Sequence, residues 1–351
     1  MTTAIFDTPS PQPADAGART RDPPMILVTG GAGFIGSNIV AALGERGVPV
    51  AVCDFLGEEG KWRNLAKVEL CDMIHPGALT EWLGRHVHDV ATVVHMGAIS
   101  STDASDGDLV LRTNFGLSWQ LWQWCALHGK RFVYASSAAT YGAGEQGHDD
   151  DNTCAALGRL RPLSLYGWSK HLFDRRVARA VVDGEALPAQ WAGLKFFNVY
   201  GPNEYHKGSM QSVVAKIYPE AAHGDEVLLF KSGRVDIADG EQKRDFVYVG
   251  DCVDVVLWLL DHPSINGIFN VGTGEARSFA DLTRALFAAL DHPPRIAYRD
   301  MPEALRNHYQ YFTQARMDRL RVAGFTQPFK AVEEGVRLYV QRYLSQSDIY
   351  R

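Results

Sequence analysis

The stretch "MILVTGGAGFIGSNIVAALGERGVPVAVCDF", residues 25–55, decides the fold of this protein. It opens with "MILVT", an apolar run of the length of a short buried strand, and continues through a glycine-rich turn into a segment with helical spacing. A second apolar strand, "VPVAVCD", follows and ends in an acid. Strand, turn, helix and strand form a βαβ unit, and strands that are apolar throughout predict a parallel sheet covered on both faces.

Three glycines in the turn, Gly30, Gly33 and Gly36, have the spacing G-x-x-G-x-x-G. Glycines at such positions allow a tight turn, let the backbone approach a pyrophosphate and bring the helix close to the strand. The pyrophosphate then lies at the helix N-terminus, where free N–H groups and the helix dipole favour an anion. The pattern predicts a dinucleotide-binding turn, and a glycine turn in another kind of α/β protein is the alternative.

The acid at the end of the second strand bears on the choice of cofactor. Asp54 lies 18 residues after Gly36, close to the position at which an acid binds the adenosine ribose. A carboxylate there favours NAD because it repels a 2′-phosphate. Lys61 and Arg63 in the next loop are able to neutralise such a phosphate. The residues alone therefore leave both NAD and NADP open.

Further apolar strands are predicted at 67–73, 90–100, 130–142 and 191–202, and each runs into a small or polar turn. An open parallel sheet places its ligands at such turns. We therefore expect Asp72 near the adenine and "HMGA", residues 95–98, along the dinucleotide. The three tryptophans of the helical stretch 111–130 are expected in the core.

Length, charge and cysteine content limit the class of protein. With 351 residues the chain forms one large or two moderate domains, and its net charge of −6 provides no basic field for nucleic acid or an anionic membrane. No apolar run approaches the roughly 20 residues that span a bilayer. Five scattered cysteines without a C-x-x-C pair predict reduced thiols in a cytoplasmic protein, with no metal site. Residues 1–24 lack the apolar segment of a signal peptide and are predicted to be a disordered tail.

A catalytic group is predicted at the start of a later helix. In "SLYGWSKHLFDRRV", residues 164–177, Tyr166 and Lys170 share one helix face. Bringing a tyrosine from a pKa near 10 to about 7 requires roughly 4 kcal/mol, to which a fixed ammonium group and the positive nicotinamide ring of an oxidised cofactor both contribute. The tyrosinate then accepts a proton from an alcohol while a hydride leaves to a nicotinamide. Ser137, at the end of a preceding strand, is placed to hydrogen-bond the same oxygen. A helix-start tyrosine beside a solvated lysine is the alternative.

The glycine turn, the serine after a strand and the Tyr166/Lys170 pair, in this order, resemble the extended short-chain dehydrogenase/reductases. These are mostly nucleotide-sugar epimerases, dehydratases and decarboxylases, and the resemblance runs from about residue 25 to the end. It implies an α/β fold with a Rossmann doubly wound parallel sheet and a smaller, discontinuous α/β C-terminal substrate domain. The implied cofactor-binding domain is 25–200 plus 245–275, and the implied substrate-binding domain is 201–244 plus 276–351.

The resemblance also separates the chemistries of the family. Dehydratases carry an Asp-Glu pair where this chain has Ala138 and Ala139, which disfavours elimination. The stretches "SSAATYG", "FNVYGPNEYHKGSM", "KRDFVYVGD" and "YQYFTQA" are together more similar to ADP-glycero-manno-heptose 6-epimerases than to UDP-galactose 4-epimerases. Such enzymes act in the cytoplasm on ADP-heptose for the lipopolysaccharide inner core, as homo-oligomers such as pentamers. The alternatives are an epimerase or reductase for another nucleotide sugar and an NADP-sensing module without turnover.

Epimerisation of this kind implies a second proton-transfer group. Inverting C6 through a transient ketone places the substrate oxygen at two positions, and one group cannot lie within about 3 Å of both. By resemblance Lys207 of "YHKGSM", residues 205–210, serves the position that Tyr166 does not. The resemblance implies NADP as cofactor, with Lys61 beside its phosphate. NAD remains the alternative because the hydrophobic Phe55 follows Asp54.

The remaining site residues follow from the same resemblance. Arg244 is expected at the ADP pyrophosphate, because a guanidinium fork suits paired oxygens. Lys216 stands where a histidine is expected, and the loop 231–242 is longer than that of the family. The implied cofactor-binding residues are Gly30, Gly33, Phe34, Ile35, Gly36, Asp54, Phe55, Lys61, Asp72, Met73, Met96, Gly97, Ala98, Asn114, Lys170 and Val199. The implied substrate-binding residues are Ser137, Asn198, Ser209, Lys216, Phe230, Arg244 and Tyr309.

Overall fold

The computed structural model describes residues 24–58, 60–102, 104–303 and 309–351. The predicted disordered tail lies outside these residues, apart from Pro24. Within the described part of the chain, no helix has the length and apolar character needed to cross a membrane.

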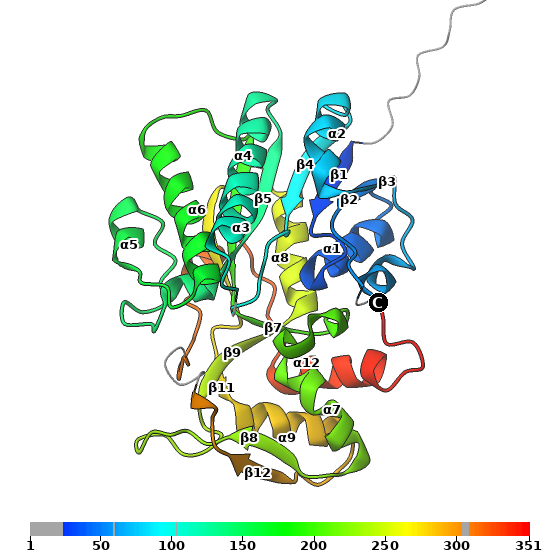
Figure 1. Cartoon of the computed structure of the whole chain (residues 1–351), viewed down its shortest axis with the longest axis vertical. Helices are drawn as coiled ribbons and strands as arrows, with labels where there is room; N and C mark the ends of the chain where they lie inside the picture. Colours follow the sequence, from blue (N-terminus) through cyan, green and yellow to red (C-terminus); the bar gives the residue numbers. More distant parts are fainter. Residues whose placement is uncertain (1–23, 59, 103, 304–308) are drawn as a thin grey trace, which may run out of the picture.

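A parallel sheet of seven strands is the centre of the described structure, in the order β10-β6-β5-β4-β1-β2-β3 (Figure 1). The strands nearest the glycine turn are buried along their whole length, as continuous apolar strands require, and Val28 of β1 pairs with Val52 of β2 and Val94 of β4. This sheet confirms the predicted doubly wound α/β fold. The strands are β1 Met25–Thr29, β2 Val50–Cys53, β3 Asp72–Ile74, β4 Val90–His95, β5 Arg131–Ser137, β6 Gln190–Phe196 and β10 Gly267–Val271.

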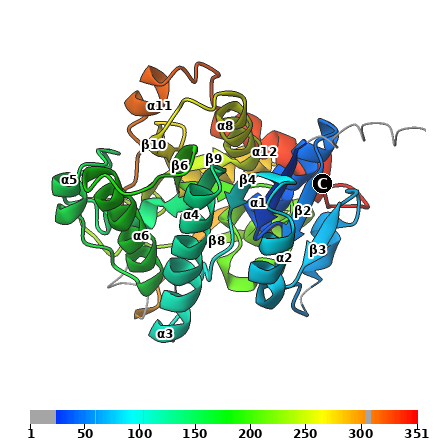
Figure 2. The same cartoon turned by 90° about the horizontal axis from the view of Figure 1, so that it is seen from above.

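Helices cover the two faces of this sheet, and each face has its own apolar core (Figure 2). One core joins the sheet to α1 (Phe34–Glu45) and α8 (Val249–Asp261). The other joins it to α2 (Leu79–Arg85), α4 (Leu117–Leu127) and α6 (Leu165–Val182). Trp122 of α4 is fully buried in this core, and Trp119 and Trp124 pack against the core. These positions agree with the expectation for the tryptophan-rich helix. The shorter helices on this part are α3 Gly107–Val110 and α5 Cys154–Arg159.

The second part of the molecule lies at one end of the sheet, towards the bottom of Figure 1. Its core is formed mainly by α7 (Val213–His223), α9 (Phe279–Ala289) and α12 (Val332–Tyr339). Two small sheets line it, one of β7 (Asn198–Tyr200), β9 (Lys243–Tyr248) and β11 (Ala276–Ser278), the other of β8 (Val227–Phe230) and β12 (Ile296–Arg299). Short 3₁₀ turns span Lys61–Leu65, Pro76–Ala78, Ala138–Tyr141 and Tyr205–Met210, and π-helical turns span Leu111–Gly116 and Val340–Leu344.

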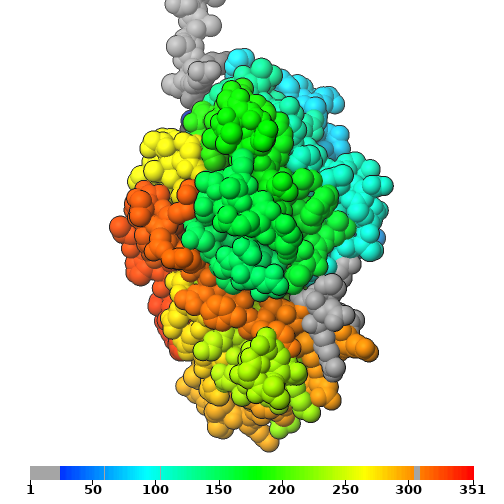
Figure 3. Space-filling model, turned by 90° about the vertical axis from the view of Figure 1, so that its left-hand side faces the viewer, coloured from blue at the N-terminus to red at the C-terminus, as the bar shows by residue number. Residues whose placement is uncertain are grey.

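One segment departs from the predicted domain boundaries. The predicted substrate-binding domain includes residues 276–351, but α11 (Asp318–Val322) places Leu320 in the apolar core between the main sheet and α8. Phe325 joins the same core, with its ring centroid 5.6 Å from that of Trp258. Burial of these apolar side chains returns the segment to the cofactor-binding part. In Figure 3 the orange chain lies between the green upper part and the yellow-green lower part.

Candidate active site

The glycine turn connects β1 to the N-terminus of α1. Gly30 has a φ of 66°, in the left-handed region that favours glycine. A Cβ atom at Gly30 would lie 2.5 Å from the amide nitrogen of Gly97, and one at Gly36 would overlap the carbonyl oxygen of Gly30. Only the absence of these side chains lets the turn pack against the helix and against the end of β4. The bare backbone beside a helix N-terminus fits the pyrophosphate of a dinucleotide.

A cleft of about 590 Å³ lies along the carboxyl ends of β1, β4, β5 and β6. All four predicted catalytic residues line it: Ser137, Tyr166, Lys170 and Lys207. So do Asn198 and most of the predicted cofactor-binding residues: Gly30, Gly33, Phe34, Ile35, Gly36, Asp54, Lys61, Met96, Gly97, Ala98, Lys170 and Val199. The carboxyl ends of parallel strands meet at one edge of the sheet, which is why residues so distant in sequence share this cleft.

Tyr166 and Lys170 lie on the first turns of α6. The helix begins after Ser164, whose hydroxyl accepts a hydrogen bond from the Gly167 amide at 3.1 Å. Lys170 Nζ donates to the carbonyl oxygen of Ala135 in β5 at 2.8 Å, which fixes the ammonium group beneath the cleft. The Ser137 hydroxyl, at the end of β5, is within hydrogen-bonding reach of Tyr166.

Burial governs the protonation of Tyr166 and Lys170 in the protein without a cofactor. Burial raises the pKa of Tyr166, and the hydrogen bond with Ser137 acts in the opposite direction without cancelling it. Burial lowers the pKa of Lys170 to about 8, with the charge of Asp174 opposing that shift. In the protein without a cofactor, desolvation of the phenol therefore decides the direction of the shift. The predicted lowering of the Tyr166 pKa includes the positive charge of a bound oxidised nicotinamide and stays a prediction for that complex.

Lys207 reaches the same cleft from the other part of the molecule. It lies in the 3₁₀ turn Tyr205–Met210, and its Nζ atom is 5.2 Å from the ring centroid of Phe34, the first residue of α1. Burial lowers the pKa of Lys207, the charge of Glu204 opposes this shift, and the charge of Lys216 adds to it. A half-buried amine over an aromatic ring is thus held next to the dinucleotide-binding turn.

At the end of β2, Asp54 and Lys61 form an ion pair with a distance of 2.6 Å between Nζ and Oδ1. Asp54 also accepts a hydrogen bond from the Ala32 amide in the glycine turn at 2.9 Å, and Lys61 donates to the carbonyl oxygen of Phe55 at 3.0 Å. The carboxylate expected at the ribose is therefore partly neutralised. His206 lines the cleft nearby, and burial together with the charge of Lys61 lowers its pKa to about 4.

Four predicted cofactor-binding residues do not line the cleft. Phe55 is exposed and packs edge-on against His75, and Met73 is at the rim of the sheet. Asp72 accepts a hydrogen bond from Trp82 Nε1 at 2.6 Å. Asn114 is fully buried. Its side-chain oxygen accepts a hydrogen bond from the Ile99 amide, and its side-chain nitrogen donates to the Ile99 carbonyl oxygen, which fixes the chain after β4.

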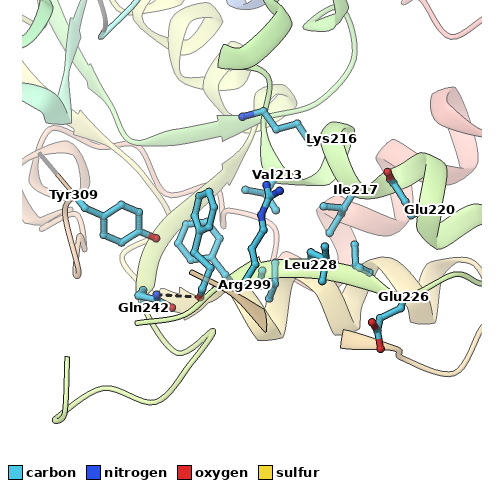
Figure 4. A pocket seen from close by; sticks show the side chains of 13 residues that line it. Val213, Lys216, Ile217, Glu220, Glu226, Leu228, Gln242, Arg299 and Tyr309 are labelled. Carbon is cyan, nitrogen blue, oxygen red and sulfur yellow. Dashed lines mark hydrogen bonds between the residues drawn. The ribbon is translucent and has the colours of Figure 1, made fainter. Parts of the chain in front are cut away.

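A second cavity, of about 410 Å³, lies between α7, β8 and β12 (Figure 4). Three predicted substrate-binding residues, Lys216, Phe230 and Tyr309, line it together with Gln242 and Arg299. Figure 4 shows Lys216, Arg299 and Tyr309 among the side chains that line it. Its walls are aromatic and aliphatic, and two cations, Lys216 and Arg299, and two acids, Glu220 and Glu226, line it as well. Apolar walls with cations suit a flat base joined to phosphates.

Arg244 lies behind two residues that line this cavity. Its guanidinium carbon is 5.1 Å from the ring centroid of Tyr309 and 5.7 Å from that of Phe279. The side chain is buried, and in the described residues it forms no ion pair with a carboxylate. Burial lowers the pKa of Arg244 to about 10. A buried cation without an acidic partner is costly unless an anionic ligand compensates it.

Ser209 is exposed and lines neither cavity, so the structure does not bring it to the predicted substrate site. Conversely, His206, Met210 and Gln310 line the main cleft although the sequence reasoning did not single them out. The motifs could have indicated them, because His206 and Met210 lie within "YHKGSM" and Gln310 lies within "YQYFTQA". Gln310 donates to the carbonyl oxygen of Gly142 at 2.5 Å, which joins the two parts of the molecule across the cleft.

The main cleft and its sheet define a nucleotide-dependent enzyme of the short-chain dehydrogenase/reductase type. A family model described as the NAD dependent epimerase/dehydratase family matches residues 26–272. The chain belongs to this family, which confirms the resemblance and a nicotinamide cofactor. A crystal structure of the UDP-glucose 4-epimerase of Thermus thermophilus in complex with NAD superposes with a TM-score of 0.67, at 28% identity over 90% of this chain and 97% of that one.

Two other similar proteins have a more specific name. An ADP-L-glycero-D-manno-heptose-6-epimerase of Nitratidesulfovibrio vulgaris (strain DP4) is 48% identical over 328 residues, which are 92% of this chain and 99% of that protein. The crystal structure of the Helicobacter pylori ADP-L-glycero-D-manno-heptose-6-epimerase superposes with a TM-score of 0.75, at 26% identity over 92% of this chain and 96% of that one.

Proposed function

We propose that the protein is an ADP-glycero-manno-heptose 6-epimerase, which inverts C6 of the heptose for the lipopolysaccharide inner core. The observation that carries this proposal is the meeting of Tyr166 and Lys207 in one cleft, from α6 and from the turn Tyr205–Met210. Two proton-transfer groups are what inversion at a single carbinol needs. The curated relative from Nitratidesulfovibrio vulgaris, named for this activity, supports the choice of substrate.

In the proposed mechanism the bound nicotinamide supplies the hydride acceptor and donor. Tyr166 accepts the proton of the C6 hydroxyl of one epimer, and Ser137, within reach of Tyr166, hydrogen-bonds the same oxygen. Lys170, held by the Ala135 carbonyl, keeps a positive charge beneath the phenol. Lys207 gives its proton to the oxygen when the ketone presents its other face. The return reaction exchanges the roles of the two groups.

The second cavity is proposed to hold the ADP moiety. Arg244, buried without an acidic partner, and Lys216 at the cavity rim would bind the diphosphate. Asn198 would contact the sugar from the main cleft, which it lines. Ala138 and Ala139 line the same cleft without an acid or base for elimination, in keeping with epimerisation.

NADP is the proposed cofactor, with NAD as the alternative. Lys61 offsets the charge of Asp54 and uses two of its three N–H donors on Asp54 and the Phe55 carbonyl. One donor is left for a 2′-phosphate. We further propose that the enzyme is cytoplasmic. We also propose that it forms a homo-oligomer, and light scattering of the purified protein would test the oligomeric state.

The direct test incubates the protein with NADP and ADP-D-glycero-D-manno-heptose and follows the configuration at C6 by NMR. We expect both epimers to appear and to reach equilibrium. Turnover of UDP-galactose with no change in ADP-heptose would instead assign the protein to the 4-epimerases of the same family. Binding of NADP with turnover of neither sugar would indicate a sensing module.

A further inference from the structure

Glu204 is a buried acid in the loop that leads to Lys207. Its side chain is 0% exposed, and within the described residues it forms no ion pair. Its oxygens accept hydrogen bonds from the Gly201 amide at 3.3 Å, the Ser212 amide at 2.5 Å, the Ser212 hydroxyl at 2.7 Å and the Tyr339 hydroxyl at 3.1 Å. Two of these partners are backbone N–H groups, which only donate. Burial raises the pKa of Glu204, and these donors act against the rise by favouring the ionised carboxylate.

These hydrogen bonds join three segments at one carboxylate. Gly201 follows β7, Ser212 is the N-cap of α7, and Tyr339 ends α12. The main chain of Glu204 also takes part, because its carbonyl oxygen accepts a hydrogen bond from the Lys207 amide at 3.0 Å. The side chain of Glu204 therefore holds both ends of the loop 201–212, while its backbone sets the turn on which Lys207 lies.

The charges around Lys207 come from several elements. On its own turn, Glu204 favours the protonated amine, and the neighbouring His206 has its pKa lowered to about 4, so it is neutral near pH 7. From α7 the charge of Lys216 opposes protonation, and from α1 the ring of Phe34 lies with its centroid 5.2 Å from the amine. Burial also opposes protonation. The negative charge of Glu204 is thus what compensates a desolvated cation.

We propose that Glu204 is a positioning residue for Lys207: it holds the turn that carries the lysine and keeps its amine protonated, ready to donate. This role rests on the proposed function, in which hydride returns to the ketone carbon while a proton passes from the ammonium group to the ketone oxygen. The N–H bond breaks, the O–H bond forms, and neutral Lys207 remains. Without the negative charge the amine would hold its proton less strongly, because burial and the charge of Lys216 both lower its pKa.

The test compares Glu204→Gln, which removes the charge but keeps the shape, with Tyr339→Phe, which removes one hydrogen bond but keeps the charge. Reductive methylation of Lys207, followed by peptide mass spectrometry from pH 7 to 10, reports the fraction of neutral amine without any turnover. We expect methylation at pH 8 to be about tenfold faster in Glu204→Gln, equivalent to one pH unit in the midpoint. Tyr339→Phe should match the wild type.

Activity gives the second measurement. The alkaline limb of the pH–rate profile for epimerisation should move to lower pH in Glu204→Gln and stay in place in Tyr339→Phe. A purely structural role would lower the rate in both variants without moving the limb. An unchanged methylation midpoint in folded Glu204→Gln would overturn the inference even if the enzyme epimerises ADP-heptose. A shifted midpoint in a protein that does not epimerise would overturn the proposed function alone.

If Glu204→Gln does not fold, the variant Lys207→Met, which keeps Glu204, still tests the interaction between the two charges. Two charges that interact shift each other's titration reciprocally. Burial raises the pKa of Glu204, and the hydrogen bonds from Ser212 and then the charge of Lys207 act against this rise. Lys207→Met should therefore raise the carboxyl midpoint seen by carbon-13 NMR further. A carboxyl midpoint that does not move would refute the coupling.

Discussion

The Nζ atom of Lys195 lies 2.7 Å from Oδ2 of Asp174, and both side chains are almost fully buried behind the catalytic helix. Asp174 also accepts hydrogen bonds from the hydroxyls of Tyr134 and Ser136, and Lys195 donates to Thr140. The pair therefore ties β6 to α6, one helical turn after Lys170. It holds that helix against β5, whose Ala135 carbonyl receives the Lys170 ammonium group.

Asp174→Asn should destabilise the protein by about 3–5 kcal/mol, because it leaves the charge of Lys195 buried without compensation. Urea denaturation measures this change. Asp261→Asn is the control, since the Asp261–Arg46 pair is exposed and its loss should cost less than about 1 kcal/mol. Equal free energies of unfolding for the two variants would show that the buried pair is not required.

Tyr166→Phe and Lys207→Met should each lower epimerisation by about 10²–10⁴-fold, the usual contribution of a positioned acid or base. Each variant should still oxidise one of the two epimers, and the epimer should differ between them. The appearance of reduced nicotinamide after mixing with each pure epimer tests this. Normal epimerisation by Lys207→Met would reduce Lys207 to a binding residue.

Lys61→Met should weaken NADP binding by at least about tenfold, as loss of a charge-assisted contact of about 1.5–3 kcal/mol implies. Asp54 would then face the 2′-phosphate without its partner. NAD binding should change much less. Calorimetric titration with both cofactors measures the ratio, and Lys231→Met, which removes an exposed pair with Asp300, is the control. Equal losses for the two cofactors would argue against a phosphate contact.

Arg244→Met should weaken ADP binding by at least about tenfold while leaving stability unchanged or higher. The guanidinium group is buried against two aromatic rings without a carboxylate partner, so an apolar side chain of similar length suits the free protein better. Calorimetry with ADP and thermal unfolding separate the two effects. A large loss of stability with unchanged ADP affinity would contradict the anion-binding role.

Acidification should destabilise the protein through His95. Burial, and then the charge of Lys170, lowers the pKa of His95 to about 3, whereas an unfolded histidine titrates near 6.5. Below pH 6.5 the unfolded state therefore binds the extra proton, and stability falls by up to about 1.4 kcal/mol per pH unit until the folded pKa is reached. Denaturation between pH 6.5 and 4.5 measures the slope. His95→Asn should reduce it by about that amount, and an identical slope would rule out this origin.

The local part of the site could be read from the sequence. The spacing of Gly30, Gly33 and Gly36 between two apolar strands depends only on neighbouring residues, because it reflects backbone sterics within one βαβ unit. Tyr166 and Lys170 share a helix face for an equally local reason. The doubly wound sheet follows from repeating such units, whose crossovers are right-handed. The family resemblance added Lys207, with Phe34 and Lys216 near it, but not Glu204 or His206.

The sequence by itself determined the fold class, the dinucleotide turn and the Tyr166/Lys170 group, since these depend on short-range periodicity and sterics. Only the tertiary structure decided that the distant residues Glu204 and Tyr339 meet and that Arg244 is buried without an acidic partner among the described residues. It also decided that desolvation raises the pKa of Tyr166 despite its neighbouring lysine. Burial and charge depend on packing between segments far apart in the chain, which no local pattern encodes.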